Sequence, residues 1–486
     1  MAEESKIDYN KLGFKSGLEV HQQLDADGRK LFCKCPNVLR KDEPDYIVER
    51  KLHAVAGETG EIDIAAKHEA EKEKNFFYEC YHENVCLVDL DEEPPREINE
   101  EALKIALQIS LLLNAKIIPI TQIMRKTVID GSNTSGFQRT AMIARDGWVD
   151  TSYGRAIIQG IFLEEDSARP TKKEAKRTYY RLDRLGIPLV EITTDASMKN
   201  PEQVREVALH IGNVLRSCKV KRGIGTIRQD VNFSIKKGKR TELKGFQEPK
   251  MMTKVLDNEI NRQLSLIEKG KEIDSEVRNV LPDGTTEYMR PMPGGARMYP
   301  ETDLPLLKMS RAYIDDIRKN LPKLRTEIGE ELKEKGLHEE MIKLLFKENK
   351  LEEFRELLEI LDKPQLIVKL LIIFPKEIAS HEKLSLSKVN ELLNRDVLAD
   401  VLHALDKEKI SESNIKNILE RIVQGESFEQ AISKREAKEN IEEKILKLIK
   451  SKPGLSANAY MGLVMSELKG QINGKEAMEI IRKHAK

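Results

Sequence analysis

Hydrophobic and polar residues follow two different periods along the 486-residue chain, and the change lies near residue 305. Before it, runs rich in Val, Ile and Thr at 116–123 and 188–194 predict β-strands, separated by loops rich in Gly, Ser and Asp. Apolar residues at helical spacing also predict three helices there, at 98–114, 201–219 and 250–270. The second of these opens with Pro201 directly after Asn200, a typical N-cap sequence. The first part of the chain therefore predicts an α+β fold with a mainly antiparallel sheet.

After residue 306 the period is almost entirely helical, with Leu, Ile, Lys and Glu repeating through 311–375, 386–408 and 412–450. A last segment, 454–486, carries glycines around a predicted helix at 461–468. We therefore predict three domains, with boundaries at 1–305, 306–445 and 446–486.

Two short apolar runs in the first part of the chain contain or precede side chains that can bind cations. Glu19 and His21 alternate around Val20, so on a strand they lie on the same face. Glu164 and Glu165, with Asp166, follow the apolar run 157–163. Oxygen ligands with one imidazole suit Mg²⁺ or Mn²⁺ and a phosphorylated substrate. The simpler alternative is a pair of strand ends with solvated acids.

Further strands place charged residues at alternate positions. Arg228, Asp230 and Asn232 share one strand face, and Glu242 and Lys244 share another. Glu191 lies on the strand that follows the turn at Asp183-Arg184. A purely structural sheet does not normally combine so many ionisable residues with a buried face.

The loop 131–140 offers backbone amides, hydroxyls and a guanidinium, among them Ser135, Gln138 and Arg139. Such a loop can hold an anion. It is not a Walker motif, because no Gly-Lys-Ser/Thr follows.

Five cysteines form two close pairs and one single residue: Cys33 with Cys35, Cys80 with Cys86, and Cys218. Two pairs can hold a structural zinc ion, and His82 can replace one ligand. The alternative, small buried hydrophobic residues, has about equal support.

Charge is balanced over the whole chain, with 82 basic and 82 acidic residues, so any contact with nucleic acid needs a local patch. The stretch 444–486 is one candidate, with nine Lys or Arg against three Asp or Glu. An ordinary solvated helical tail is equally compatible with that excess. No apolar run has membrane-spanning length and no signal peptide pattern is present, so we expect a soluble, cytoplasmic protein.

Eight segments, in order, resemble the GatB/GatE family of tRNA-dependent amidotransferase subunits. They are GLEVHQQLDADGRKLFCKCP, CLVDLDEEPP, GSNTSGFQRTAMIARDG, FLEEDSAR, RLDRLGIPLVEITT, GIGTIRQDVNFSI, ELKGFQEP and GGARMYPETDLP. The details SNTSGFQRT, GIGTIRQDVN and MYPETD resemble the archaeal E branch more than the bacterial B branch. The resemblance covers essentially the whole chain.

The resemblance implies a fold and a reaction. A cradle domain similar to glutamine synthetase would use ATP and Mg²⁺ to phosphorylate the γ-carboxylate of Glu-tRNA(Gln). Ammonia from a partner, in the E branch an asparaginase-like D subunit in a heterotetramer, would then attack the acyl phosphate. The helical domain and a YqeY-like tail would hold the tRNA.

The resemblance and the residue patterns described above together assign site residues. Those expected at the catalytic centre are Glu19, His21, Glu164, Glu165, Asp183 and Arg184. Those expected to bind ATP or phosphate are Ser135, Gln138, Arg139 and Arg228. The expected metal ligands are Glu19, His21, Glu164, Glu165 and Asp230, and the zinc ligands are Cys33, Cys35, Cys80 and Cys86.

One departure from the family pattern concerns an inserted domain. The archaeal E branch normally carries a domain related to one in aspartyl-tRNA synthetases. Here the helix that ends near Ile267 leads to Leu281-Pro282-Asp283-Gly284 within a few residues, so no such domain fits. This weakens any expectation about tRNA discrimination and leaves the kinase motifs intact.

Two other functions agree with the sequence. One is a B-type subunit partnered with an amidase, which also amidates Asp-tRNA(Asn). The other is a non-catalytic tRNA-binding scaffold, which would tolerate loss of Glu19, His21 or Glu164. All three residues are present, and this favours the enzyme.

Overall fold

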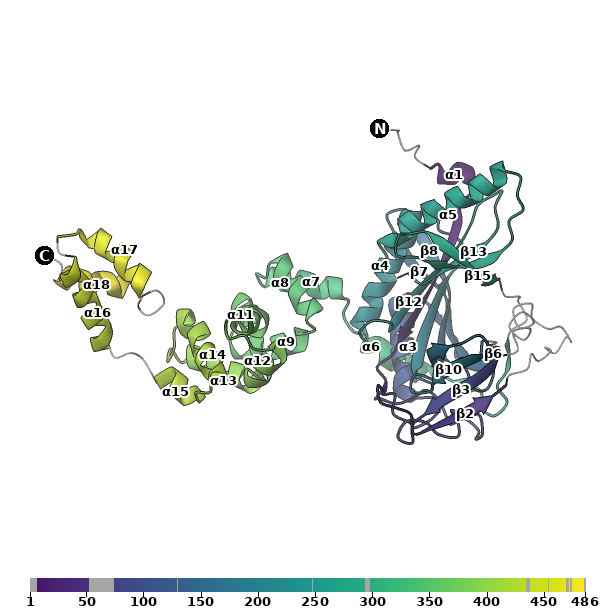
Figure 1. Ribbon diagram of the computed structural model, residues 1–486, viewed down its shortest axis with the longest axis horizontal. Helices are drawn as coiled ribbons and strands as arrows, with labels where there is room; N and C mark the ends of the chain where they lie inside the picture. Colours follow the sequence, from purple (N-terminus) through teal and green to yellow (C-terminus); the bar gives the residue numbers. More distant parts are fainter. Residues whose placement is uncertain are drawn as a thin grey trace. The chain divides into compact units, whose positions relative to one another are not determined.

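The computed structural model shows two compact units, Met1–Arg325 and Thr326–Lys486 (Figure 1). The structure describes residues 7–51, 74–128, 130–246, 248–292, 298–433, 438–452, 454–468, 472 and 474–484. The fold is α+β: a large mixed sheet comes first and helices follow.

The first unit is built on an 11-stranded sheet in the order β15-β14-β13-β12-β1-β11-β8-β7-β6-β16, with β4 attached to β7. Among the described strands of this sheet, every neighbouring pair is antiparallel except β13 and β14, which are parallel. The strands are β1 (Lys15–Gln23), β4 (Lys116–Ile117), β6 (Ile123–Thr127), β7 (Phe137–Thr151), β8 (Gly154–Glu165), β11 (Pro188–Thr194), β12 (Ile227–Ser234), β13 (Thr241–Lys244), β14 (Glu276–Val280), β15 (Thr286–Pro291) and β16 (Met298–Pro300).

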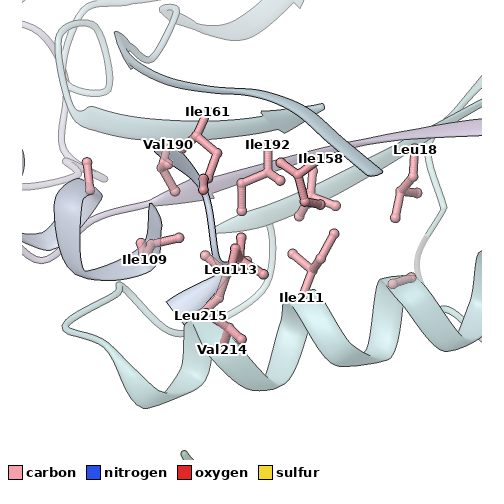
Figure 2. Close-up of a cluster of buried hydrophobic side chains, with 14 of the residues drawn as sticks. Leu18, Ile109, Leu113, Ile158, Ile161, Val190, Ile192, Ile211, Val214 and Leu215 are labelled. Atoms are coloured by element: carbon pink, nitrogen blue, oxygen red, sulfur yellow. The ribbon is translucent and has the colours of Figure 1, made fainter. Parts of the chain in front are cut away.

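Three long helices pack their apolar stripes against one face of this sheet: α3 (Glu100–Leu112), α4 (Pro201–Ser217) and α5 (Met251–Glu268). Figure 2 shows side chains from the strands and from the helices meeting in this core, among them Leu18, Ile158, Ile161, Val190, Ile192, Ile109, Leu113, Ile211, Val214 and Leu215. The core fixes the orientation of each strand, because alternate residues point to opposite faces.

The three predicted helices form close to their expected bounds, and the N-cap predicted for the second is confirmed. Asn200 Oδ1 accepts a hydrogen bond from the Gln203 N–H (2.7 Å) at the start of α4, and Asn99 caps α3 in the same way. The strand signal at 116–123 is confirmed, although no continuous strand forms there. Three short strands, β4, β5 (Ile120–Thr121) and β6, occupy this stretch, because Pro119 has no N–H for a continuous ladder.

A second, four-stranded sheet has the order β2-β3-β10-β9 and its own small core. Its strands are β2 (Tyr46–Arg50), β3 (Asn75–Cys80), β9 (Arg169–Lys173) and β10 (Arg177–Arg181). The unit also contains the strand pair β17 (Leu307–Lys308) and β5, the short helix α1 (Tyr9–Leu12), and α6 (Arg311–Lys319).

The second unit is helical. Its elements are α7 (Arg325–Glu334), α8 (Glu339–Lys347), α9 (Leu351–Ile360), α10 (Pro364–Val368), the π-helical turn η1 (Lys369–Ile373), α11 (Phe374–His381), α12 (Leu386–Leu392), α13 (Arg395–Asp406), the 3₁₀ turn η2 (Glu412–Asn414), α14 (Ile415–Val423), α15 (Phe428–Ser433), α16 (Lys438–Ser451), α17 (Ala457–Glu467) and α18 (Gly474–His484).

The long periodic stretches of this unit are divided more finely than the sequence indicated. Gly336 and Asn349 have left-handed backbone angles (φ 85° and 56°) that a helix interior does not allow, so the helix ends before each. Buried apolar residues form two clusters, one from Ile328 to Ala431 and one from Ile445 to Ile481. The predicted boundary near 445 stays a prediction.

None of the described helices combines the length and the apolarity needed to cross a membrane.

Candidate active site

The sheet face opposite the three long helices carries a concentration of ionisable side chains. On β1, Leu18 and Val20 are buried in the core, so Glu19 and His21 point to the opposite face. The same alternation on β12 buries Val231 and turns its neighbours Asp230 and Asn232 the other way. Backbone pairing places His21 opposite Glu191 of β11, and Glu19 opposite Asp230 of β12.

One set of possible metal ligands consists of His21, Glu164 and Glu191, and we name it the His21 group. One ligand atom from each of these residues lies within 4.8 Å of the others. His21 Nε2 is 3.4 Å from Glu191 Oε2 and 3.9 Å from Glu164 Oε1. Lys126 Nζ donates to Glu191 Oε2 at 2.8 Å and lies 3.4 Å from Glu164 Oε2.

Burial and mutual charge perturb this group strongly. Burial raises the pKa of Glu164 to about 7, with repulsion from Glu191 adding to it and the Lys126 ammonium opposing it. Burial acts against the charged form of His21, but its contacts with Glu191 and Glu164 outweigh this and raise its pKa. The pKa of Glu191 is held well below its ordinary value despite burial, because Lys126 and His21 both face it. The Lys126 ammonium, with His21 in its protonated form, thus offsets the charge of the two carboxylates.

A second set, the Glu19 group, consists of Glu19, Asp230 and Glu242, again with ligand atoms within 4.8 Å of one another. Lys244 Nζ lies 2.5 Å from both Asp230 Oδ2 and Glu242 Oε1. Asn232 donates to Glu19 Oε1 at 3.0 Å. Burial and the charges of Glu242 and Glu191 raise the pKa of Glu19.

A cavity of about 530 Å³ opens beside both groups and includes Glu19, Glu191 and Lys126 in its lining. Apolar side chains of Met142, Phe162 and Met298 and polar groups that include Thr193, Asp195 and Arg240 complete its walls. The volume and the mixture of apolar walls with a charged end suit a small polar ligand.

The donor sets fit divalent cations. The His21 group combines two carboxylates with an imidazole, and the Glu19 group has three carboxylates. Both are ligand sets that suit hard cations. The lysine ammonium groups already sit between these carboxylates, where a positive charge is needed. His21 Nδ1 is buried and has no hydrogen-bond partner among the described residues.

Glu165 and Asp166 do not join either group. Glu165 accepts from Arg139, whose Nη1 is 3.4 Å from Glu165 Oε2, and Arg139 Nε also donates to Glu301 (2.9 Å). Asp166 accepts from Arg228 Nη2 (3.0 Å) and from the amide of Gln23 (2.6 Å). Glu164 and Glu165 are neighbours on β8, so a strand directs only one of them to each face. The geometry therefore does not support Glu165 as a metal ligand beside Glu164.

The turn residues Asp183 and Arg184 have local structural contacts. Asp183 Oδ2 accepts from Arg169 (2.6 Å) and from the backbone N–H of Arg40 (2.8 Å). Arg184 donates to the carbonyl oxygens of Ser167 (2.7 Å) and Ala168 (2.9 Å). Neither lies in the two groups that gather the metal-ligand candidates.

The expected anion loop is also internally bonded. Ser135 Oγ donates to the Phe137 carbonyl (2.9 Å), and Gln138 donates to the Glu165 carbonyl. Arg139 is 4% exposed and lies between Glu165 and Glu301. Binding of an anion by Arg139 requires that these contacts rearrange.

Three cysteines meet, but with a different fourth residue than expected. Sγ atoms of Cys33, Cys35 and Cys86 lie within 4.8 Å of one another and of an Asp89 carboxylate oxygen. Cys80 is fully buried in the core of the smaller sheet, where its Sγ contacts the Tyr78 carbonyl (3.4 Å). His82 packs against Tyr46, and Cys218 lies in the main core. Three thiols with one carboxylate remain a suitable donor set for zinc.

Three residues of these clusters, Glu191, Glu242 and Asp89, received no ligand role from the sequence. Signals existed for each: Glu191 lies between the buried residues Val190 and Ile192, Glu242 precedes the buried Leu243, and Asp89 follows Cys86 at a spacing typical of ligand pairs. Of the two lysines that neutralise the groups, Lys244 shares a strand face with Glu242 in the sequence, whereas Lys126 left no signal. Lys126 lies on β6, which two strands separate from β11 in the sheet, and only the folded structure shows that its Nζ reaches Glu191.

Comparison with known proteins gives a consistent result. Residues 14–315 match the GatB/GatE catalytic domain, and residues 352–484 match the GatB domain. A protein of Methanocaldococcus jannaschii, named as the E subunit of glutamyl-tRNA(Gln) amidotransferase, is 34% identical, over 99% of this chain and 100% of its own. Proteins of the same name from Methanothermobacter thermautotrophicus and Methanobrevibacter smithii are also 34% identical, over 85% and 98% of this chain and 87% and 99% of their own.

The alignment with the M. jannaschii protein runs over 633 positions, whereas this chain has 486 residues, so that relative carries sequence absent here. In this chain α5 ends at Glu268 and β14 begins at Glu276. This short connection agrees with the missing insertion that the sequence indicated.

Proposed function

Because the chain belongs to the GatB/GatE family, we propose that it is the tRNA-modifying subunit of an amidotransferase, which converts the glutamate of misacylated Glu-tRNA(Gln) to glutamine. The observation that carries the proposal is the pair of buried acidic groups beside a cavity on one face of the large sheet. A tRNA-binding scaffold has no need for this costly concentration of buried charge.

In this proposal ATP binds in the cavity and Mg²⁺ binds at the two groups. The ligands would be Glu19, Asp230 and Glu242 at one and His21, Glu164 and Glu191 at the other. Bound there, the cation neutralises phosphate charge during phosphoryl transfer. Lys126 and Lys244 would leave the carboxylates and become available to phosphate oxygens.

The proposed reaction has two chemical steps. A γ-carboxylate oxygen of the glutamate attacks the γ-phosphorus of ATP, the bond to the β-phosphate oxygen breaks, and ADP leaves. The nitrogen of ammonia then attacks the acyl carbon, inorganic phosphate leaves, and one proton is lost. The acids on this face and His21 are the acceptors available for that proton.

The remaining parts of the proposal follow from the family. The first domain, 1–305, would be a cradle similar to glutamine synthetase, and 306–445 and 446–486 would be a helical domain and a YqeY-like tail that hold tRNA. An asparaginase-like D subunit would supply ammonia within a heterotetramer. A structural zinc would bind Cys33, Cys35 and Cys86, with Asp89 in place of Cys80.

The test is reconstitution of the amidation. The chain is combined with an asparaginase-like partner, ATP, Mg²⁺ and Glu-tRNA(Gln), with asparagine, glutamine or ammonium chloride as nitrogen source. We expect Gln-tRNA(Gln) to form and to require ATP. A chain that binds Glu-tRNA(Gln) but yields no product with ammonium chloride would exclude the proposed activity, and product formed only with an amidase partner would favour a B-type subunit.

A further inference from the structure

Two exposed basic residues line the cavity beside the acidic groups without an acidic partner. They are Lys15, at the start of β1, and Arg240, directly before β13. Among the described residues, neither forms an ion pair with a carboxylate, and the side chain of Arg240 bonds only to the amide of Asn232. Lys126 and Lys244 differ, because each lies between two carboxylates. The positive charge of Lys15 and Arg240 is therefore still available to a ligand.

A neutral amide fixes the guanidinium of Arg240 close to the Glu19 group. Arg240 Nε and Nη2 each donate to Asn232 Oδ1 at 3.1 Å, and Asn232 Nδ2 donates to Glu19 Oε1 at 3.0 Å. An amide oxygen orients the guanidinium but does not cancel its charge. A guanidinium has five N–H donors, and Arg240 Nη1 donates to no residue that the structure describes. Arg240 thus keeps free donors next to a proposed metal ligand.

The lining of the cavity includes two glycines, Gly17 of β1 and Gly160 of β8. Gly17 lies between Lys15 and Glu19 on the same face of the strand. A Cβ at Gly17 would lie 3.2 Å from the Asp195 carbonyl oxygen, and one at Gly160 would lie 2.8 Å from the Phe162 ring, so neighbouring atoms leave little room for a side chain at either position. Between Lys15 and Glu19, β1 is therefore open to the close approach of a ligand.

This arrangement suits a chain of phosphates better than a single small anion. A divalent cation at the Glu19 group would bind some phosphate oxygens, because Mg²⁺ in proteins is typically held by carboxylates together with substrate phosphates. Arginine binds further oxygens with its planar fork, and lysine adds a point charge. One carboxylate or one phosphate group is too small to use the Glu19 group and both separate cations at once.

We propose that Arg240 and Lys15 bind the phosphate chain of the nucleotide substrate, with the Arg240 guanidinium placed beside the Glu19 group. The inference rests on the proposed function, which makes ATP a substrate of this face. A phosphodiester of tRNA offers the same chemistry, but it does not need a divalent cation at its side. The neighbouring acidic groups therefore favour the nucleotide.

The experiment measures binding of a non-hydrolysable ATP analogue to the full chain by calorimetry in the presence of Mg²⁺. We expect Arg240→Ala to lower the affinity by about tenfold to a hundredfold, because charge-assisted hydrogen bonds to phosphate are lost. Arg240→Lys should recover part of the loss, since it keeps the charge and loses the fork. Lys15→Ala should have a smaller effect, because a lysine contributes a charge without the paired donors.

The matched control is Arg205→Ala. Arg205 lies on α4, is exposed, and does not line the cavity. Its replacement removes the same charge from the chain, and we expect the affinity for the analogue to stay at the wild-type value. Thermal unfolding and binding of a tRNA(Gln) transcript, measured for every variant, should also be unchanged. A general structural role of Arg240 would instead lower the unfolding temperature of Arg240→Ala.

The outcomes separate this inference from the proposed function. If Arg240→Ala binds the analogue like the wild type while the wild-type chain amidates Glu-tRNA(Gln), Arg240 is not part of the nucleotide site. If the variant loses affinity only for the tRNA, the phosphates that it binds belong to RNA and the inference is wrong. If the analogue binds more weakly to the variant but the wild-type chain does not amidate, the proposed function fails and the nucleotide site stands. A wild-type chain that does not bind the analogue contradicts both.

Discussion

Lysine side chains balance both acidic groups of the open sheet face. Lys126 Nζ lies between Glu164 and Glu191, and Lys244 Nζ lies between Asp230 and Glu242. Partly buried carboxylates at this separation repel each other unless a cation is present. Each lysine therefore stabilises the protein in the position where the proposed mechanism needs a metal ion.

Removing one lysine should make stability depend on divalent cations. We expect Lys126→Met to lower the free energy of unfolding by about 3 kcal/mol in EDTA, because two buried carboxylates lose their counter-charge. Added Mg²⁺ should restore most of the loss. Thermal unfolding with and without Mg²⁺ measures both effects.

The control is Lys172→Met, which removes an exposed lysine beside Glu174 and should change little under either condition. A Lys126→Met protein that unfolds like the control, or that Mg²⁺ does not stabilise, would contradict the assignment of the His21 group as a cation site.

The cysteine cluster gives a second prediction at this scale. Purified protein should hold about one zinc per chain, and Asp89→Asn or Cys86→Ser should reduce zinc content and stability, since each removes a proposed ligand. Cys80→Ala should keep its zinc and lose only packing energy. Zinc analysis by mass spectrometry distinguishes the two sets. Loss of zinc in the Cys80→Ala variant but not in the Asp89→Asn variant would instead support the site of four cysteines predicted from the sequence.

Along individual strands, residues that pack in the core alternate with residues that face the proposed active site. On β1, Leu18 and Val20 face the core, and Glu19 and His21 face the acidic side. The two-residue period alone could predict this division, and it also predicted the common face of Asp230 and Asn232 on β12.

Other features depended on neighbouring elements and could not be predicted in this way. Glu165 is next to Glu164 in sequence, yet it pairs with Arg139, which also binds Glu301, and only contacts across strands reveal this partner. Asp89 joins the cysteines through the fold of a loop that no period describes. Helices in the second unit end just before residues with left-handed backbone angles, such as Asn349, although the apolar period of the sequence continues past these residues.

The alternation on β1 predicts opposite effects of adjacent substitutions. Glu19→Ala should abolish ATP-dependent activation and leave tRNA binding and stability nearly unchanged, because it removes a proposed Mg²⁺ ligand. Leu18→Ala should cost about 2 to 5 kcal/mol of stability and spare the chemistry of the protein that remains folded. Phosphate release, tRNA binding and thermal unfolding are measured for both. Loss of stability in Glu19→Ala without loss of phosphate release would reverse the interpretation.

At the scale of the molecule, the chain separates an acidic face in its first unit from a basic stretch at 444–486. The net charge of the whole chain is zero, so it indicates neither feature. The proposed division of labour places chemistry in the first unit and part of the tRNA contact in the tail.

Deleting 444–486 should therefore affect binding more than catalysis. We expect a higher KM for Glu-tRNA(Gln) and a weaker dependence of binding on salt, because fewer phosphates are neutralised. Ammonia-dependent turnover at saturating tRNA should largely survive. If the deletion lowers stability and leaves KM and the salt slope as in the full chain, the tail only caps the helical unit.

The central claim is that the acidic face activates the glutamate carried by the tRNA. The most direct measurement is ATP-dependent release of phosphate in the presence of Glu-tRNA(Gln), Mg²⁺ and ammonium chloride, comparing the wild-type chain with Glu164→Gln and with the exposed-residue control Glu174→Gln. We expect release by the wild type and by the control, and none above background by Glu164→Gln, with tRNA binding unchanged in all three. Near-normal release by Glu164→Gln would contradict the claim.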